Sequence, residues 1–424
     1  MIILVLNCGS SSVKYSLFSM GSEEIRLVRG SLERIGLPGA RLIQETSDHK
    51  VECITSAADH SQAIAELMDI LAKTYQSLLP SLDNIDAAGH RIVHGGDRFN
   101  DAVKIDDEIL RYLWDQSYLA PLHNPPNLMG MKAISRLLPK IPQVAVFDTA
   151  FHQTLPPRAY LYALPYDLYK KHRIRRYGFH GTSHRYVAHE AARIMGKPLK
   201  DLKLLTCHLG NGSSIAAVKY GKSVDTTMGF TPLEGLAMGT RCGDVDPAVI
   251  LFLQDRLGLS PSEIGDILNR QSGMVGLSGF SSDMREILKA VYLDGRGLDG
   301  ALNTNHLRHE RSKIALGVYI YRIRRYIGAY AAAMGGVDAI VFTGGIGQNL
   351  SIIQNEACRG LEFMGVDMGS NMKSGMVSGI KSTAYLGQGC YQLSSLTSNV
   401  KVLAIPTDEE LMIARDTLRV IQTL

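Results

Sequence analysis

A mixed α/β fold built from two similar halves is the fold that this sequence predicts, and a repeated strand and turn pattern is the main reason. The apolar run 2–6 ends at a polar turn rich in glycine and serine, and alternating residues from Val13 then begin a second strand. The same order returns at 204–214, with a second strand from Ile215. Each copy is predicted to be a β-hairpin, with one copy in each half.

Strands and helices follow one another through the rest of both halves. The first half is expected to hold strands at 13–19, 25–32, 40–45, near 85–88 and at 144–147, and an amphipathic helix with Ile64, Leu67, Met68 and Leu71 on its apolar face. The second half is expected to hold strands at 203–208, 213–219, 222–225 and 339–342, and helices around 246–257, 260–270, 281–293 and 306–334. The last helix, about 407–422, should fold back onto the first half.

Length and composition narrow the class of protein. The 424 residues are enough for two domains, since one domain usually takes about 100–200 residues. The 45 basic and 41 acidic residues give a net charge of only +4, which argues against nucleic acid or a membrane as a partner. The six cysteines are scattered and form no C-x-x-C pair, so a reducing compartment, the cytoplasm, is expected. No membrane span is expected, because the best candidate, 327–342, contains Gly335, Gly336 and Asp338.

The tips of the two hairpins are suited to binding phosphate. Glycine lets the backbone approach a ligand closely, and successive amide groups can surround an anion. A turn of this composition between two strands is more often only a turn. The presence of two such turns, with Lys14 just after the first, favours a nucleotide phosphate site.

Several motifs in the chain fail a test of their context. Gly295-Arg296-Gly297-Leu298-Asp299-Gly300 matches a dinucleotide fingerprint but follows a helical stretch, so it is expected to be a loop. His180 and His184 have the spacing of a metal pair, but Ser183 between them is expected to be a helix N-cap, so a metal site there is not expected. The serines at 10–12 lack the G-x-S-x-G pattern of a nucleophile.

Polar residues at the ends of two strands mark a candidate site. Arg91 follows the strand near 85–88, and Asp148 follows the strand at 144–147. Ligands of open α/β sheets bind beyond the carboxyl ends of the strands. Arg91 and Asp148 are therefore expected where the chemistry takes place.

Eight blocks spread along the whole chain, in matching order, resemble the acetate kinase family. They are Asn7-x-Gly9-Ser10-Ser11-Ser12-x-Lys14, Gly89-His90-Arg91-x-Val93-His94-Gly95-Gly96, Phe147-Asp148-Thr149-Ala150-Phe151-His152, Tyr177-Gly178-Phe179-His180-Gly181-Thr182-Ser183-His184, His208-Leu209-Gly210-Asn211-Gly212-Ser213-Ser214, Asp225-Thr226-Thr227-Met228-Gly229-Phe230-Thr231-Pro232-Leu233-Glu234-Gly235-Leu236, Gly239-Thr240-Arg241-Cys242-Gly243-Asp244 and Pro406-Thr407-Asp408-Glu409-Glu410-Leu411. The resemblance implies an α/β fold of duplicated RNase H-like (actin-like ATPase) domains with an interdomain ATP cleft. It implies an acid- and magnesium-side domain, residues 1–150 plus about 405–424, and a nucleotide-binding domain, residues 151–404.

The reaction implied is reversible transfer of the ATP γ-phosphoryl group to acetate, which gives acetyl phosphate and ADP. By resemblance the catalytic residues are Arg91, Asp148, His180 and Arg241, and the acid is bound by Arg91, Val93, Leu122, Phe179 and Pro232. A guanidinium matches carboxylate or phosphate with two parallel hydrogen bonds. Acetate is already ionised at neutral pH and needs no general base, so Asp148 is interpreted as a residue that orients Arg91 or a magnesium-bound water.

The resemblance also assigns the nucleotide and the metal. ATP or ADP would contact Ser12, Lys14, His208, Leu209, Gly210, Asn211, Gly212, Asp283, Met284, Arg285, Gly345, Ile346, Gly347, Gln348 and Asn349. Gln348 is a departure, because the family usually has Glu there. Asn7 and Glu409 match the magnesium ligands, with Mn²⁺ as an alternative ion, and their oxygen donors suit a phosphate-bound Mg²⁺. The family forms homodimers, so a homodimer is expected.

Three alternatives stay open. A propionate kinase of the same family is the nearest, although Val93 favours acetate because propionate-preferring relatives tend to have a smaller residue there. A chaperone or filament protein of the same superfamily would lack the pair Arg91 and Arg241. A non-catalytic regulatory module would have lost some of the catalytic or metal residues, all of which are present.

Overall fold

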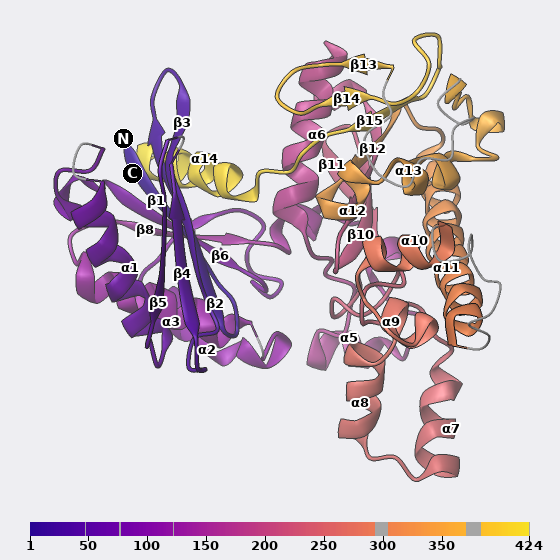
Figure 1. Ribbon diagram of the computed structural model, residues 1–424, viewed down its shortest axis with the longest axis horizontal. Coiled ribbons are helices and arrows are strands. Elements are labelled where there is room, and N and C mark those ends of the chain that lie inside the picture. The colour runs from indigo at the N-terminus through magenta and orange to yellow at the C-terminus, as the bar shows by residue number, and fades with distance from the viewer. Residues whose placement is uncertain (47, 76–77, 122, 293–303, 370–382, 424) are drawn as a thin grey trace. The chain divides into compact units, whose positions relative to one another are not determined.

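The chain forms two compact units. The computed structural model describes residues 1–46, 48–75, 78–121, 123–292, 304–369 and 383–423 (Figure 1). The first unit comprises Met1–Gln153, Gly181–Ser183 and Asp408–Leu424, and the second comprises Thr154–His180 and His184–Thr407. The sequence predicts boundaries at 150 and about 405, and does not predict that 181–183 join the first unit.

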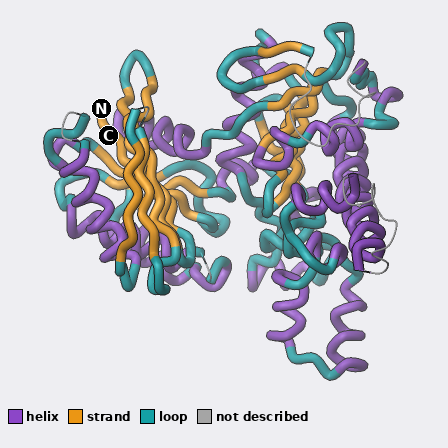
Figure 2. Tube along the Cα trace, viewed as in Figure 1, coloured by secondary structure: helices purple, strands orange, loops and turns teal. Residues whose placement is uncertain are grey.

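The first unit is built on an eight-stranded sheet, whose strands are drawn as orange tubes in Figure 2, with the order β5-β4-β3-β2-β1-β6-β8-β7. Its strands are β1 Ile2–Cys8, β2 Ser12–Met20, β3 Glu24–Glu33, β4 Ala40–Glu45, β5 Lys50–Thr55, β6 Ala87–Ile92, β7 Val103–Lys104 and β8 Gln143–Phe147. β1 and β2 form the predicted hairpin, which pairs Asn7 with Lys14. β1, β6 and β8 are parallel neighbours, so their carboxyl ends meet at one edge of the sheet.

Helices cover the two faces of this sheet. α1 His60–Thr74 and α3 Asn124–Leu137 pack on one face through Ile64, Leu67, Leu71 and Ile134. The C-terminal helix α14 Glu409–Gln422 packs on the other face, where Ile413 and Ala414 contact residues of β1, β2 and β8. The remaining helical segments are α2 Asp107–Asp115, η1 Leu82–Asn84, η2 Ser117–Leu119 and η3 Ala150–Thr154. The structure confirms that the last helix folds back onto the first half.

The second unit is built on a seven-stranded sheet with the order β11-β10-β9-β12-β15-β14-β13. Its strands are β9 Lys203–Leu209, β10 Ser213–Lys219, β11 Lys222–Thr226, β12 Ala339–Thr343, β13 Ala384–Tyr385, β14 Tyr391–Gln392 and β15 Lys401–Ala404. β9 and β10 form the second predicted hairpin. β9, β12 and β15 are parallel, as β1, β6 and β8 are in the first unit.

The longest helix, α11 Thr304–Met334, lies against one face of this sheet and closes the core of the second unit. Its buried side chains Tyr319, Ile323 and Ile327 share this core with Leu205 and Phe342 of the sheet. The other helical segments are α4 Pro157–Tyr160, α5 Tyr166–His172, α6 Gly181–Met195, η4 Leu199–Asp201, α7 Pro247–Leu257, α8 Pro261–Arg270, α9 Gly273–Ser278, α10 Met284–Tyr292, α12 Gly344–Asn349, α13 Ser351–Cys358 and η6 Glu362–Met364. Figure 1 shows α7 and α8 as a helical pair that projects from this unit.

Two local predictions are wrong. The strand near 85–88 extends to Ile92, so Arg91 lies within β6 rather than after it. Ser183 is not an N-cap, because α6 begins at Gly181 and His180 occupies the cap position with a φ of 57°. Residues 344–349, for which the sequence predicts no element, form helix α12. The motif at 295–300 and the residue Leu122 lie outside the described residues.

None of the helices in the described part of the chain has the length and apolar character needed to span a bilayer. All six cysteines are described, and none of them forms a disulfide.

Candidate active site

Arg91 and Asp148 form a bidentate ion pair in the first unit. The Nε and Nη2 groups of Arg91 donate to Asp148 Oδ1 and Oδ2 at 3.1 and 2.5 Å. The Asp148 side chain is 1% exposed and that of Arg91 is 21% exposed. The two carboxylates near this guanidinium, Asp148 and Glu409, raise the pKa of Arg91 above its usual value against the opposing effect of burial. The ion pair therefore locks the plane and the charge of Arg91.

The two predicted metal ligands lie on either side of the same guanidinium. Arg91 Nη1 donates to Asn7 Oδ1 at 3.2 Å, and Arg91 Nε lies 3.9 Å from Glu409 Oε2. Burial raises the pKa of Glu409 to about 7, which Arg91 partly opposes and Asp148 adds to. An amide oxygen and a carboxylate are hard oxygen donors of the kind that Mg²⁺ accepts, and Mg²⁺ usually takes only one or two protein ligands. The donor set of Asn7 and Glu409 therefore fits this ion. No cluster of three or more His, Cys, Asp or Glu residues suited to a metal occurs in the described residues.

The turn of the first hairpin is held by hydrogen bonds to its own backbone and to α3. Gly9 N–H donates to Ser12 O at 2.7 Å. Asn127 Nδ2 donates to Cys8 O at 2.5 Å, and Asn127 Oδ1 accepts from Val93 N–H at 3.3 Å. Asn127 is buried, so one side chain joins the turn beside Asn7 to the strand end beside Arg91. Lys14 and Ser12 lie at the start of β2, and the Lys14 side chain is exposed.

The apolar residues predicted to bind the acid are divided between the units. Val93 of the first unit is 7% exposed, and Phe179 of the second unit is 2% exposed. Pro232 belongs to the loop 227–246 of the second unit, where its carbonyl accepts from Arg241 Nη1 at 2.9 Å. Val93 is buried at the carboxyl end of β6 and Phe179 directly before the start of α6.

In the second unit, His180 and Arg241 lie against the same glycine. A Cβ atom added to Gly212 would lie 3.5 Å from His180 Nε2 and 3.7 Å from Arg241 Nη1. The ring of His208 stacks on that of His180 with a centroid distance of 4.3 Å. His180 Nδ1 lies 2.9 Å from Ser214 Oγ. The structure therefore brings His180, His208, Gly212 and Arg241 together.

Arg241 has no carboxylate within ion-pair distance among the described residues of its unit. Its guanidinium is bonded to Pro232 O and to Met238 Sδ, and burial lowers its pKa. Even partial burial of a cation without a counter-ion is unfavourable, so such a group is suited to binding an anion. This is the opposite of Arg91, which already has its partner.

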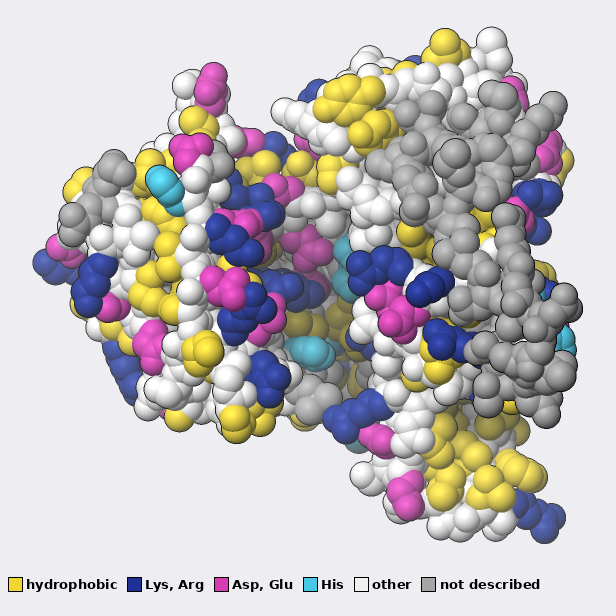
Figure 3. Space-filling model, viewed as in Figure 1, with side chains coloured by type: hydrophobic (Ala, Val, Ile, Leu, Met, Phe, Trp, Pro, Cys, Tyr) yellow, Lys and Arg dark blue, Asp and Glu magenta, His cyan; other side chains and the backbone are white. Residues whose placement is uncertain are grey.

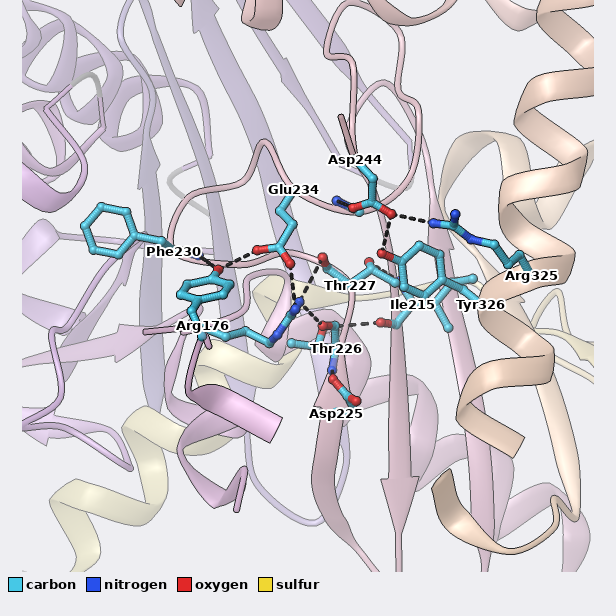
Figure 4. A network of polar contacts seen from close by, with 12 residues as sticks. Arg176, Ile215, Asp225, Thr226, Thr227, Phe230, Glu234, Asp244, Arg325 and Tyr326 are labelled. Atoms are coloured by element: carbon cyan, nitrogen blue, oxygen red, sulfur yellow. Dashed lines mark hydrogen bonds and ion pairs between the residues drawn. The ribbon is translucent and has the colours of Figure 1, made fainter. Parts of the chain in front are cut away.

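Two networks of ion pairs hold the loop that carries Arg241 (Figure 4). Arg176 Nη2 donates to Glu234 at 2.6 Å, its Nη1 donates to Thr226 O at 2.7 Å, and Glu234 also accepts from Tyr162. At the other end of the loop, Asp244 accepts from Arg325 and from Tyr326, the latter at 2.7 Å. These contacts are expected to keep the guanidinium of Arg241 in place.

Most of the predicted nucleotide residues line one pocket of about 650 Å³ in the second unit. Its lining is Gly210, Asn211, Ser282, Asp283, Met284, Arg285, Gly345, Ile346, Asn349 and Leu350. This volume is in the range of small-molecule pockets. Arg285 bonds Asp283 through Nε and Nη2 and is largely exposed. Ser282 and Leu350 were not predicted.

The other predicted nucleotide residues do not line this pocket. Leu209 is buried in the core, and His208 and Gly212 lie with His180. Gly347 is packed under Leu209, and the carbonyls of Gly347 and Gln348 accept from the buried Gln354. The backbone carbonyl of Gln348 therefore accepts a hydrogen bond at the end of α12, and this contact does not depend on whether the side chain is Gln or Glu.

Sequence reasoning missed the residues that support the site. Asn127 and Ser214 are buried polar groups bonded to the site residues Val93 and His180, and Glu234 orders the loop of Arg241. The run Asn124-Pro125-Pro126-Asn127 was the available signal, because two prolines at the start of a helix fix the direction in which it begins.

A family model described as the Acetokinase family matches residues 2–415 of this chain. The chain belongs to the acetokinase family. Among its relatives, an acetate kinase from Thermotoga petrophila is 52% identical over 423 residues, which cover 100% of this chain and 99% of the relative. An acetate kinase structure from Porphyromonas gingivalis is 45% identical, covers 99% of each chain and has a TM-score of 0.88. A propionate kinase structure from Francisella tularensis is 38% identical, with the same coverage and a TM-score of 0.85.

The likeness to these acetokinase structures extends over the whole fold. The chain has the duplicated, actin-like ATPase fold, as the resemblance implies. The two hairpins, β1–β2 and β9–β10, are the corresponding elements of its two units.

Proposed function

We propose that this chain is an ATP:acetate phosphotransferase that converts ATP and acetate reversibly into ADP and acetyl phosphate. The observation that carries the proposal is Arg241, a half-buried guanidinium without a carboxylate partner among the described residues of its unit. It lies beside His180 and Gly212, next to a pocket lined by Gly210 and Asn211. Such a cation suits the charge of a phosphoryl group in transfer.

In the proposed reaction an acetate oxygen attacks the γ-phosphorus in line, and the bond from that phosphorus to the β–γ bridging oxygen breaks. The carboxylate is already charged, so no proton is removed. Arg91 binds the acetate, and Asp148 holds Arg91 in the orientation that this requires. The bidentate ion pair at 3.1 and 2.5 Å supports this role for Asp148.

We propose that the ATP nucleoside occupies the pocket of the second unit, with Asp283, Met284 and Arg285 on one side and Gly345 and Ile346 on the other. The phosphates of ATP would be bound by Ser12, Lys14 and the backbone of the turn 208–212. Arg91 and Val93 of the first unit and Phe179 and Pro232 of the second unit would bind the acid.

Asn7 and Glu409 would hold Mg²⁺ together with phosphate oxygens and water. The bound ion would offset part of the negative charge on the phosphates. Both side chains lie next to Arg91, which donates to Asn7 Oδ1 at 3.2 Å and lies 3.9 Å from Glu409 Oε2, so the same residues would place the ion near the arginine that binds the acid. Mn²⁺ has similar preferences for oxygen and should replace Mg²⁺.

Acetate is the proposed acid, and propionate is the alternative. Val93 is buried and leaves less room than the smaller residue expected for propionate. One methylene in an apolar pocket is worth only about 1–3 kcal/mol, so propionate should be a poorer substrate that is still used. Measuring kcat/KM for acetate, propionate and butyrate tests this, and a preference for propionate would reverse the assignment.

We propose a cytoplasmic homodimer. The six reduced cysteines support a reducing compartment. Helix α7 supports self-association, because it buries none of its residues and exposes Leu251, Phe252 and Leu257 by more than half. Hydrophobic side chains gather on the projecting α7–α8 pair in Figure 3. A large apolar surface of this kind marks an interface.

A hydroxylamine trap tests the proposed activity. Hydroxylamine converts acetyl phosphate into acetohydroxamate, which is measured by its colour with ferric ion. The chain with ATP, Mg²⁺ and acetate should produce hydroxamate, and the Arg241→Ala variant should produce far less. The control is Tyr220→Ala, which changes an exposed residue outside the site. This variant should produce as much hydroxamate as the unaltered chain. A chaperone, filament protein or regulatory module would give no acetate-dependent hydroxamate.

A further inference from the structure

A chain of hydrogen bonds runs from the core of the second unit to His180. His180 Nδ1 lies 2.9 Å from Ser214 Oγ, and the same oxygen lies 2.8 Å from His184 Nε2. His184 Nδ1 lies 2.7 Å from Thr206 Oγ1. Thr206, His184 and Ser214 are each 0% exposed, so water does not reach these bonds.

The elements of the unit place these groups in line. Thr206 is on β9, Ser214 is on the neighbouring β10, and His184 is in the first turn of α6. In the ladder between the strands, Thr206 lies opposite Ala216 and Ser214 lies opposite His208. His184 packs against both hydroxyls, and His208 stacks on His180.

When both imidazoles are neutral, two arrangements of the protons let the buried Ser214 hydroxyl donate to an acceptor in this chain; if it accepted from both imidazoles, its own proton would have no acceptor there. Each hydroxyl supplies one proton, and each neutral imidazole has one N–H and one acceptor nitrogen. In the outward arrangement, Thr206 donates to His184, His184 donates to Ser214, and Ser214 donates to His180 Nδ1. His180 then carries its proton on Nε2. In the inward arrangement every bond is reversed, and His180 Nε2 has no proton.

The distances favour the outward arrangement. In the inward arrangement the Thr206 hydroxyl must donate elsewhere, and its other acceptor, Ala216 O, is 3.5 Å away. A hydroxyl donor normally lies about 2.7–2.8 Å from its acceptor, and a buried donor without a good acceptor is unfavourable. In the outward arrangement the same hydroxyl donates over 2.7 Å to His184.

We propose that Thr206, His184 and Ser214 form a positioning relay that keeps the proton of His180 on Nε2. That atom lies toward Gly212 and Arg241, where the transferring phosphoryl group is proposed to pass. A neutral His180 can donate a hydrogen bond there only in this tautomer. The use of the relay in catalysis rests on the proposed function, but its effect on the tautomer does not.

A spectrum of the full chain measures the tautomer directly. Long-range ¹H–¹⁵N correlations of protein labelled with ¹⁵N in its 13 histidine rings distinguish the two nitrogens, and the signal lost in His180→Asn identifies His180. The expected result is His180 protonated at Nε2. Protonation at Nδ1 in the unaltered protein would overturn the proposal without any variant.

Substitutions at Thr206 test the relay at its far end. Thr206→Val keeps the shape of the side chain and removes the hydroxyl, so the Nε2-protonated form of His180 should decrease. We expect kcat to fall by at least about tenfold, because a donor to developing charge is typically worth more than that. The KM values for ATP and acetate should stay within about twofold. Thr206→Ser restores the hydroxyl and should restore both kcat and the spectrum.

The outcomes separate the relay from packing and from the proposed function. An unchanged tautomer in Thr206→Val, or an equal loss of kcat in Thr206→Ser, would show that Thr206 acts by packing and would overturn the relay. If Thr206→Val does not fold, Ser214→Ala takes its place in both measurements. If the chain makes no acetyl phosphate but His180 responds to Thr206 as expected, the relay stands and the proposed function fails.

Discussion

Arg91 and Arg241 show how the surroundings of a single residue decide its use. Asp148 neutralises Arg91 through two hydrogen bonds and thereby fixes its plane. In the described part of the chain, Arg241 is bonded to the neutral groups Pro232 O and Met238 Sδ, so its charge is not compensated there. A carboxylate substrate needs a guanidinium held in one orientation, whereas a phosphoryl group in transfer carries more charge and needs a cation that is not yet neutralised.

Substitution of Asp148 separates orientation from proton transfer. In Asp148→Asn, Arg91 loses its charged partner, and kcat/KM for acetate should fall about a hundredfold because the guanidinium is no longer held. The dependence of kcat/KM on pH, measured from about pH 5 to about pH 9, should keep the ionisations of the unaltered enzyme. An ionisation that Asp148→Asn abolishes would show that Asp148 carries a proton. Asp97→Asn, an exposed change in the same unit, is the control.

His90, next to Arg91 on β6, should make stability depend on pH. Burial lowers the pKa of His90 from its ordinary 6.5 to about 4. Between these values the unfolded chain binds a proton that the folded chain does not bind. The free energy of unfolding should therefore fall as the pH is lowered from 6.5 to about 4, at up to about 1.4 kcal/mol per pH unit.

Urea denaturation at pH 5 and pH 7 measures this dependence. His90→Asn should reduce the difference between the two midpoints. His49→Gln, at an exposed position, should leave it unchanged. A His90→Asn variant with the full pH dependence of the unaltered chain would assign that dependence to other groups.

At the scale of elements, the two hairpins have similar backbones, but their turns lie beside different functional residues. The turn after β1 lies beside Arg91 and the proposed metal ligands, and the turn after β9 lies beside His180, Arg241 and the pocket. Both hairpins could be predicted from sequence, because alternation and a glycine-rich turn are local signals. What surrounds each turn depends on helices that are distant in the chain.

Asn127 of α3 illustrates this dependence and can be tested. Its side chain satisfies the buried carbonyl of Cys8 and the amide of Val93. Asn127→Ala should lower the free energy of unfolding by about 1–3 kcal/mol, because it leaves two buried backbone groups unpaired. It should also raise KM for acetate, because Val93 is no longer tied to the turn.

Asn100→Ala is the matched control, since Asn100 is exposed in the same unit. Thermal unfolding and acetate saturation curves of both variants give the comparison. An Asn127→Ala protein as stable as Asn100→Ala, with an unchanged KM, would refute the bridging role.

At the scale of the whole molecule, the exposed apolar side chains of α7 are the strongest sign of assembly. Light scattering should give a mass of twice 46.4 kDa for the chain. Phe252→Glu places a charge on a side chain that is 56% exposed, and it should shift the mass toward 46.4 kDa. Leu396→Glu, 68% exposed elsewhere in the second unit, should not. A dimer that survives Phe252→Glu would place the interface on another surface.

Much of the fold could be predicted, because most of its elements carry strong local periodicity. The hairpins, the amphipathic helix of Ile64 and Leu67, and the return of the last helix are all confirmed. The strands β5, β7, β13, β14 and β15 were not predicted; β7, β13 and β14 have two residues each, too few to show a periodicity. The start of α6 at Gly181 was also missed, because its N-cap His180 has a φ of 57°, which only the surrounding structure stabilises.

The sequence by itself determined the duplicated architecture, the family and the identity of the residues that can carry charge. These follow from local patterns and from motifs that can be recognised in the sequence without coordinates. Only the tertiary structure decided that Arg91 has a carboxylate partner, that no such partner for Arg241 occurs among the described residues of its unit, and that Thr206 reaches His180 through two other side chains. Charge pairing and hydrogen-bond direction depend on distances between segments far apart in the chain, and no local pattern encodes those distances.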